Sequence, residues 1–474
     1  MSKTVHTVDL CVIGAGSAGL SVAYGASHLG RSVVLFERED MGGDCLNTGC
    51  VPSKALIKAA KVAHGRRHGS EYGIAPSEPG IDFEAVKAHI QGVIDQIAPV
   101  DSVERYTGFG VTVIKEDARF ADDRTIVSDG HEVRAKRIVV AAGSRAAIVP
   151  IPGLDTVDYL TNESIFQVDR LPDHLMIVGS GPIGLELGQS FRRLGSEVTI
   201  IDIAEPLARN DPDHAKGLIE RLKAEGVAFR APARTERISQ ASGGTITVEF
   251  ENGDPITGSH LLMAAGRAPN VEGLDLEKGG VAYDRHGIGT DDALRTSNRR
   301  VYAAGDIAAG KGGLTHAAGF HASALIKNLY FLPPGLGGLF AKATTDRMPA
   351  VIYTQPELGT IGASHRDAAR TLHFAFDEND RAIAERDTDG GVKLYLDAKG
   401  KLIGASVLGS HAGEIINTIS LAMAGDLKLS QIAGMISPYP TRTEAVKRAA
   451  SSYFTDAVFG PKAKALSGFW TKFQ

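Results

Sequence analysis

Residues 8–19 have the sequence VDLCVIGAGSAG, an apolar run followed directly by a glycine-rich turn. The apolar run, Val8 to Gly14, is typical of a strand buried on both faces of a parallel sheet. The Gly-x-Gly-x-x-Gly turn and the Ala- and Leu-rich segment after it predict a strand–turn–helix unit that binds a dinucleotide. Glycines let the backbone approach a pyrophosphate, and the N-terminus of the helix supplies partial positive charge.

A second copy of this unit has its strand at 175–178, the turn GSGPIG at 179–184 and a further strand at 197–201. In both copies an acidic residue, Glu37 or Asp202, lies 18 positions after the last glycine, where it can bind an adenosine ribose. One such turn is a weak signal, but two matched copies predict two dinucleotide-binding folds. Asp202 favours NADH over NADPH, because a carboxylate repels a 2′-phosphate.

The composition is that of an ordinary globular protein. The chain has 474 residues, 43% of them hydrophobic and 23% charged, and a net charge of −5. This length predicts two to four domains. The charge offers no basic field for nucleic acid or an acidic membrane, and the N-terminal residues do not resemble a secretory signal. We therefore expect a cytoplasmic protein with small-molecule partners.

Two of the three cysteines, Cys45 and Cys50, stand in the segment GGDCLNTGCVPSK at 42–54. Half of a zinc site is one interpretation, but no second Cys or His pair is nearby in the sequence. A structural disulfide is another, and a reducing cytosol disfavours it. The third interpretation is a redox-active pair. Cys11 lies in the first apolar strand and is expected to be core, and no resident metal is expected.

The segment at 42–54, Gly-Gly-x-Cys-x4-Cys-Val-Pro-Ser-Lys, makes the sequence resemble the pyridine nucleotide-disulfide oxidoreductases. This is the family of glutathione reductase, dihydrolipoamide dehydrogenase and mercuric reductase, and the resemblance covers essentially the whole chain. It implies an α/β protein with two Rossmann-like domains, for FAD and for NAD, and a C-terminal α+β dimerisation domain. The expected limits are 1–155 and 278–345 for the FAD-binding segments, 156–277 for the NAD(P)H-binding domain and 346–474 for the dimerisation domain.

The resemblance also implies roles for single residues. Cys50 would be the thiol next to the flavin, and Cys45 the interchange thiol that meets the substrate. Lys54 would lie near flavin N5 with Glu186 as its ion-pair partner; an ordinary surface pair is the alternative. The expected FAD-binding positions are Gly14, Gly16, Ser17, Ala18, Gly19, Glu37, Gly43, Lys54, Ala118, Gly143, Asp306 and Ala317. The expected nicotinamide-binding positions are Gly179, Gly181, Ile183, Gly184, Asp202 and Gly266.

The C-terminal domain departs from the family pattern. Glutathione reductase and dihydrolipoamide dehydrogenase have His-Pro-Thr-x-x-Glu, whereas this chain has Tyr439-Pro-Thr-x-x-Glu444. A phenol, with a pKa of about 10, is a poorer proton shuttle near neutral pH than an imidazole, with a pKa of about 6.5. Tyrosine at this position is similar to the mercuric reductases, yet no cysteine follows Cys50. The alternative role for Tyr439 is packing at a subunit interface.

Together these features predict an NADH-dependent FAD disulfide reductase of the mercuric reductase-like branch. It would act as a homodimer on a small disulfide or on a thiol-bound substrate, metal ions included. Poor turnover of lipoamide and glutathione disulfide is expected. Three alternatives stay open. The first is a dihydrolipoamide dehydrogenase with an atypical acid–base residue, and the second is a quinone- or oxygen-reducing flavoprotein that does not use the cysteines. The third is a non-catalytic redox sensor or structural subunit that keeps the fold.

Overall fold

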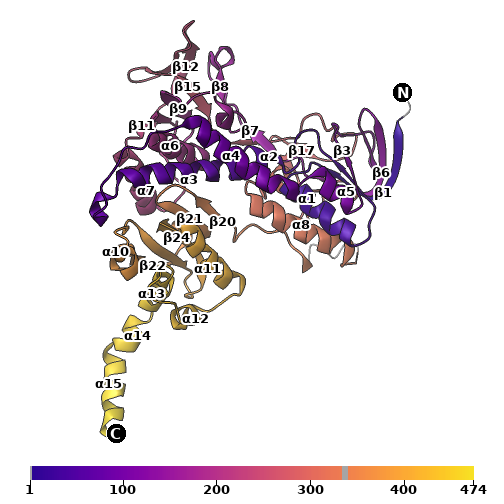
Figure 1. The fold of residues 1–474 in the computed structure, drawn as a ribbon. Coiled ribbons are helices and arrows are strands. Elements are labelled where there is room, and N and C mark those ends of the chain that lie inside the picture. Colours follow the sequence, from indigo (N-terminus) through magenta and orange to yellow (C-terminus); the bar gives the residue numbers. More distant parts are fainter. Residues whose placement is uncertain (1–2, 334–339, 474) are drawn as a thin grey trace. The chain divides into compact units, whose positions relative to one another are not determined.

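The computed structural model describes residues 3–333 and 340–473, and the chain forms two compact units (Figure 1). The first unit comprises Met1–Ile201 and Ala233–Thr345, and the second comprises Asp202–Pro232 and Asp346–Gln474. The second unit thus includes residues 202–232, which the sequence assigned to the nucleotide-binding domain. The domain limits expected from the sequence stay predictions.

A parallel sheet carries the first dinucleotide-binding fold. Its strands lie in the order β3-β2-β1-β6, and β19 also pairs with β6. They are β1 (Thr4–Ile13), β2 (Val33–Phe36), β3 (Val111–Ile114), β6 (His131–Val140) and β19 (Val301–Ala303), and the short antiparallel strands β5 (Thr125–Val127) and β4 (Arg119–Phe120) extend the sheet. β1 begins at Thr4 rather than at the predicted Val8, because its first residues pair with β6.

The turn between β1 and α1 (Ser17–His28) requires glycine at two positions for lack of space. Gly14 has a φ of +100°, and a Cβ there would lie 2.5 Å from the carbonyl oxygen of Ala141. A Cβ on Gly19 would overlap the carbonyl oxygen of Gly14. Strand and helix therefore pack backbone to backbone, which directs the N-terminus of α1 to the carboxyl ends of the strands.

A second parallel sheet repeats this arrangement. Its strands β10 (Glu197–Ile201), β9 (His174–Val178), β15 (His260–Met263) and β8 (Tyr159–Leu160) lie side by side in that order. Helix α6 (Pro182–Leu194) begins at the glycine turn, with Pro182 in its first turn. A small antiparallel sheet packs apolar side chains against the parallel one; its strands are β12 (Thr235–Gln240), β13 (Ile246–Phe250) and β14 (Ile256–Gly258).

The first unit contains several further helices. They include α2 (Gly43–Asn47), α3 (Cys50–Arg67), α4 (Phe83–Ile97), α5 (Val103–Gly108) and α8 (Thr315–Tyr330). Helix α8 packs along α1, and α3 packs against α4 and α6. The helix that follows the cysteine segment therefore lies against the first helix of the second dinucleotide-binding fold.

The second unit is built on an antiparallel sheet. Its strands, in the order β20-β21-β24-β23-β22, are β20 (Pro349–Ile352), β21 (Glu357–Gly362), β24 (Leu402–Gly409), β23 (Gly391–Leu396) and β22 (Arg370–Ala375). Helices α11 (Ala412–Ala424), α12 (Leu429–Gly434) and α13 (Glu444–Ser452) share its apolar core, and α10 (Asp380–Ala384), α14 (Thr455–Phe459) and α15 (Pro461–Trp470) complete the unit. The predicted α/β fold class, with two Rossmann-like folds and an α+β C-terminal domain, is confirmed.

A buried polar network attaches α7 (Pro212–Ala224) to this sheet. The carboxylate of Asp211, at the N-terminus of α7, lies 2.7 Å from the Nζ of Lys393 and accepts a hydrogen bond of 2.9 Å from the hydroxyl of Tyr395. Burial raises the pKa of Asp211, but its bonds to Lys393 and Tyr395 outweigh burial and leave the pKa below its usual value. This network explains why residues 202–232 belong to the second unit.

The glycine geometry gives a paired test of the second fold. Gly184→Ala places a methyl group into the carbonyl oxygen of Gly179, whereas no atom lies within 4 Å of a Cβ on Gly181. We expect Gly184→Ala to lower the free energy of unfolding by about 1–3 kcal/mol, as overpacking does, and Gly181→Ala to leave it unchanged. Urea denaturation of both variants measures this, and equal destabilisation would contradict it.

Candidate redox-active site

The cysteine pair stands at the start of α3. Cys50 is the first residue of that helix and is exposed, while Cys45 lies in α2 and is half-buried. The turn between them is closed by a hydrogen bond of 2.9 Å from the amide of Thr48 to the carbonyl oxygen of Asp44. Cys11 is buried in β1, as expected for a core residue.

The two thiols differ in acidity. A hydrogen bond from Cys45 lowers the pKa of the Cys50 thiol to about 6. The Thr315 hydroxyl, 3.2 Å from the sulfur, and the charge of Lys54 also lower this pKa. Partial desolvation of the sulfur and the charge of Asp44 act in the opposite direction. The same hydrogen bond and burial raise the pKa of Cys45. The N-terminus of α3 adds partial positive charge beside Cys50. These opposite shifts favour a thiolate at Cys50 and a protonated thiol at Cys45.

The structure brings Lys54 and Glu186 together. Lys54 lies one helical turn after Cys50, and its Nζ is 2.8 Å from Oε2 of Glu186 on α6. The Glu186 side chain is buried and that of Lys54 is only partly exposed. A carboxylate in this position is stable only when it is paired, because desolvation of a single charge is costly. The pair thus joins the cysteine helix to the helix of the second fold.

Asp44 fixes the turn between the cysteines. Its carboxylate accepts hydrogen bonds from the hydroxyl of Thr48 at 2.6 Å and the amide of Asn162 at 2.9 Å, and it forms an ion pair of 3.0 Å with Arg267. Arg267 in turn donates to the Ser144 hydroxyl at 2.9 Å. This arrangement keeps the conformation of the turn fixed from segments far apart in the chain.

The first glycine turn has the space that a pyrophosphate requires. A Cβ on Gly16 would meet nothing closer than Gly43, 4.0 Å away, so here the glycine leaves room rather than relieving a clash within the protein. A Cβ on Gly43 would lie 2.8 Å from the Cα of Gly16, which places the cysteine segment beside this turn. Ser17 and Ala18 open α1. The Glu37 carboxylate accepts a 2.7 Å hydrogen bond from the amide of Ala15 within the turn.

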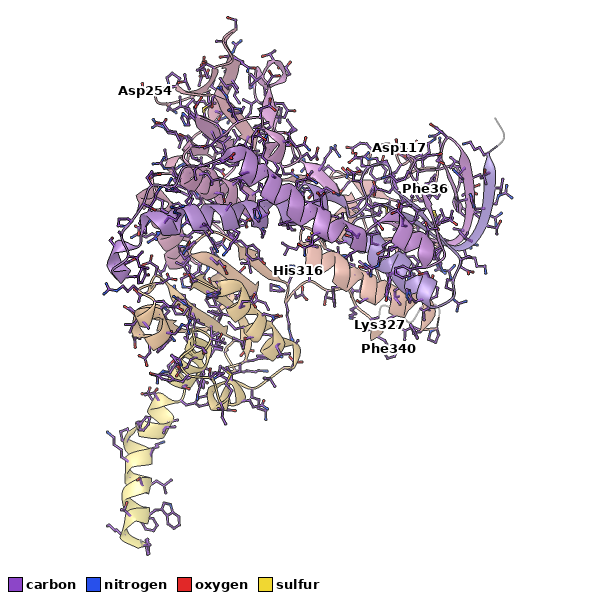
Figure 2. All side chains as sticks on the ribbon, viewed as in Figure 1. Phe36, Asp117, Asp254, His316, Lys327 and Phe340 are labelled. Atoms are coloured by element: carbon purple, nitrogen blue, oxygen red, sulfur yellow. The ribbon has the colours of Figure 1, made fainter. Side chains whose placement is uncertain are left out.

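Most of the other expected FAD-binding positions lie in the first unit near the ends of the same sheet. Asp306 accepts hydrogen bonds from the Ser144 hydroxyl at 2.7 Å and the Gly313 amide at 2.8 Å. Gly143 directly precedes Ser144 and has a φ of +67°. Ala317 is buried in the first turn of α8, and Ala118 is buried in the apolar cluster that includes Phe36, labelled in Figure 2. These residues fit a bound FAD.

The second glycine turn repeats this geometry at the start of α6. A Cβ on Gly179 would overlap the carbonyl oxygen of Ala264, while Gly181 faces open space and Ile183 is half-buried. Gly266 follows β15 with a φ of +136°. Asp202 follows the last residue of β10, and its carboxylate accepts a hydrogen bond of 3.0 Å from the amide of Ala204. The second glycine turn is thus as open at Gly181 as the first turn is at Gly16.

Tyr439 and Glu444 belong to the second unit. The Tyr439 side chain is 72% exposed, and its hydroxyl donates a hydrogen bond of 2.9 Å to Asp380, which raises the pKa of the phenol. Glu444 begins α13. Between them Arg442 is buried, 3.0 Å from Glu385 and 2.9 Å from Asp387. The segment is therefore held in place while Tyr439 points outward.

Sequence reasoning missed four residues of this arrangement: Thr315, Asn162, Arg267 and Arg442. Thr315 is 265 positions from Cys50, so no local spacing could indicate the contact. Asn162 and Arg267 bind Asp44 from the second fold, and neither lies in a recognisable motif. Arg442 stands inside the Tyr-Pro-Thr-Arg-Thr-Glu segment and was the easiest of the four to find from its position.

Comparison with known proteins agrees with this geometry. Residues 8–322 match the pyridine nucleotide-disulphide oxidoreductase family, and residues 348–450 match the dimerisation domain of that family. The chain belongs to this family, whose members are oxidoreductases that use FAD and a pyridine nucleotide.

Three relatives illustrate the range of the family. The chain is 33% identical to the mercuric reductase of Bacillus cereus over 463 residues, which are 95% of this chain and 72% of that protein. It is 30% identical to the dihydrolipoyl dehydrogenase of Bacillus subtilis (strain 168) over 458 residues, covering 93% and 98% of the two chains. The Cu(II) complex of the HOCl-induced flavoprotein disulfide reductase RclA from Escherichia coli superposes with a TM-score of 0.82 at 25% identity, covering 93% and 99%.

Residues 3–333 and 340–473 contain neither a metal-binding cluster nor a bilayer-spanning helix. No group of three or more His, Cys, Asp and Glu side chains there is arranged to hold a metal ion. No helix in those ranges has the length and hydrophobicity needed to cross a bilayer.

The contact between Thr315 and Cys50 gives a direct test. Thr315→Val removes a hydrogen bond to a charged sulfur, a contact worth about 1.5–3 kcal/mol, so we expect the pKa of Cys50 to rise by at least about one unit. The measurement is the pH dependence of iodoacetamide alkylation of Cys50 in reduced protein, followed by mass spectrometry. The exposed Thr371→Val variant is the control, and an unchanged Cys50 profile in Thr315→Val would refute the role of the hydroxyl.

Proposed function

We propose that this protein is an NADH-dependent FAD disulfide reductase of the mercuric reductase-like kind. Electrons would pass to the Cys45–Cys50 pair and from there to a small disulfide or to a thiol-bound substrate, a thiolate-bound soft metal ion included. The observation that carries the proposal is the environment of Cys50. Its sulfur lies at a helix N-terminus, 3.2 Å from the Thr315 hydroxyl and one turn before the paired Lys54.

FAD, when bound, supplies hydride acceptance from the nicotinamide and two-electron transfer to the cysteine pair. The residues of the chain provide the thiol chemistry. In the dithiol state, Cys45 attacks one sulfur of a substrate disulfide and releases the first thiol, and Cys50 then attacks Cys45 and releases the second. The Cys45–Cys50 disulfide that results has lost two electrons, and NADH restores them. Lys54 and Thr315 stabilise the thiolate of Cys50 while the pair is reduced.

The proton on Cys45 points to the substrate class. Because the pKa of Cys45 is raised, attack by this thiol needs a proton acceptor. Tyr439 is a weak acceptor, since the bond to Asp380 raises its own pKa further. Substrates that bind thiolates strongly, such as soft metal ions, depend less on a general base because the metal displaces the proton. The names of two relatives, mercuric reductase and the Cu(II) complex of RclA, support this class.

The cofactor preference and the assembly are part of the proposal. Asp202, at the end of β10, supports NADH over NADPH, because its charge repels a 2′-phosphate. The family's dimerisation domain at 348–450 supports a homodimer. In that homodimer the outward-facing Tyr439 and Glu444 would complete the partner's site. A cytoplasmic location is retained, because thiols stay reduced there.

A second candidate is dihydrolipoamide dehydrogenase, supported by the relative from Bacillus subtilis. The tyrosine at 439 weighs against it, because dithiol oxidation uses a general base at this position. A flavoprotein that reduces quinones or oxygen without its cysteines is the third candidate. The acidic Cys50 thiol and its contact with Thr315 weigh against that one.

Anaerobic titration of the FAD-loaded protein tests the proposal. We expect NADH, more readily than NADPH, to produce a long-wavelength absorption band from the Cys50 thiolate beside the flavin. The Cys45→Ser variant should show this band even without reductant. Its rate of disulfide reduction should fall by at least about 10³-fold, because the attacking nucleophile is lost. Bleaching of the flavin without the band, or full disulfide reductase activity in Cys45→Ser, would favour the quinone- or oxygen-reducing alternative.

Replacement of Tyr439 tests the substrate class. Tyr439→His installs a base with a pKa near neutrality, and we expect turnover of dihydrolipoamide and glutathione disulfide to rise by about 10²-fold. Tyr439→Phe is the matched control and should leave that turnover unchanged. Wild-type turnover within tenfold of a dedicated dithiol enzyme would contradict the proposed class, and so would a histidine variant without gain.

A further inference from the structure

Helix α15 (Pro461–Trp470) and the short 3-10 turn after it (Thr471–Phe473) carry an unpartnered apolar face. Neither α14, α15 nor this turn contains a buried residue. Figure 1 shows α14 and α15 leaving the sheet of their unit, and Figure 2 shows the α15 side chains projecting with no other element of the unit beside them. The match to the dimerisation domain ends at residue 450, so this segment lies beyond the part shared with that family model.

The apolar side chains of this segment lie on one stripe. Leu466, Phe469, Trp470 and Phe473 follow the spacing i, i+3, i+4, i+7 of a single helical face and are 59%, 52%, 59% and 70% exposed. The three aromatic rings touch: the centroids of Phe469 and Trp470 are 5.5 Å apart, and those of Phe469 and Phe473 are 5.1 Å apart. Trp470 is the one tryptophan of the chain.

The charges of the segment have a single sign. Residues 461–473 contain Lys462, Lys464 and Lys472 and no acidic residue, in a chain whose net charge is −5. No lysine of this group forms an ion pair within the described part of the chain. Lys464 and Lys472 lie off the apolar stripe, and the long stem of Lys462 lets its ammonium reach away from the stripe. The average charge of the chain therefore hides a local basic segment.

From these observations we infer that α15 and its terminal turn form a docking helix for the surface of an anionic phospholipid bilayer. A Trp- and Phe-bearing face beside lysines, without acidic residues, is the pattern of helices that lie in the bilayer interface. The rings would enter the boundary between headgroups and acyl chains, and the lysines would contact lipid phosphates. The segment lies on the bilayer and does not cross it, in agreement with the lack of a bilayer-spanning helix among the described residues.

A second copy of the same helix is a rival occupant, and the charges disfavour it. In a two-fold symmetric pair each helix would face an identical one, so lysines would approach lysines. Such like-charge approaches destabilise helix pairs, and the segment has no carboxylate to compensate. Anionic lipid supplies the missing negative charge.

The experiment uses the full-length, FAD-loaded protein and vesicles of phosphatidylcholine, with or without phosphatidylglycerol. Trp470 is the reporter, because its fluorescence arises from the segment alone. We expect a blue shift and quenching by brominated lipid, with binding about 100-fold tighter to the anionic vesicles, since each of three lysines contributes about a factor of five. Phe469→Ser/Phe473→Ser should weaken binding by at least about 100-fold and keep the reporter.

Matched variants separate the helix from general surface effects. Lys464→Glu should weaken binding to anionic vesicles by about 30-fold, because one attraction is lost and one repulsion is gained. Lys399→Glu and Ile74→Ser, at exposed positions elsewhere, should leave binding unchanged. All variants should keep wild-type flavin content and NADH oxidation, which shows that they fold.

Three results would overturn the inference. The first is no binding to anionic vesicles, and the second is binding that the Phe469→Ser/Phe473→Ser and Lys464→Glu variants leave intact. The third is a Trp470 emission that is already blue-shifted without lipid, together with a change of oligomeric state in the double phenylalanine variant by light scattering. That outcome would assign the helix to a second copy of the chain. None of these results bears on the cysteine chemistry proposed above.

Discussion

The ion pair between Lys54 and Glu186 connects the two dinucleotide-binding folds at the point where their chemistry meets. Lys54 belongs to the helix that starts with Cys50, and Glu186 belongs to the helix that starts at the second glycine turn. Their charged atoms are 2.8 Å apart, and the Glu186 carboxylate is buried, so it depends on this partner for its charge. The pair therefore fixes the cysteine helix against the nucleotide fold and keeps a cation near the Cys50 sulfur.

A chain of polar contacts extends this constraint to the FAD-binding positions. Asp44, the residue before Cys45, pairs with Arg267; Arg267 donates to Ser144; and Ser144 donates to Asp306. Asp44 lies in the cysteine turn, and Asp306 lies in the loop after β19. Ser144 and Arg267 lie where the chain enters and leaves the second fold. The cysteine turn is thus held by the same residues that surround the expected flavin site, so displacement of one would disturb the other.

The environments of Cys50 and Tyr439 shift the pKa values of these two groups in opposite directions. The first unit contains what a stable Cys50 thiolate needs, whereas the second unit offers at Tyr439 a phenol whose pKa is raised by Asp380. The proposed preference for substrates that coordinate sulfur rests on this difference between the two side chains. Arg442 holds the tyrosine segment through two carboxylates, so the exposed position of Tyr439 is a fixed feature of the domain.

The sequence alone determined the two glycine turns, the acidic residue after each, the cysteine pair and Lys54, because these depend on backbone space and on spacing within one turn or one strand. The resemblance to a known family also indicated the α+β C-terminal domain. Only the tertiary structure decided the contact of Thr315 with Cys50, the clamp of Asn162 and Arg267 on Asp44, and the attachment of α7 to the second unit through Asp211 and Lys393. These contacts join residues more than 100 positions apart, and they arise from how helices and sheets pack, which no local pattern records.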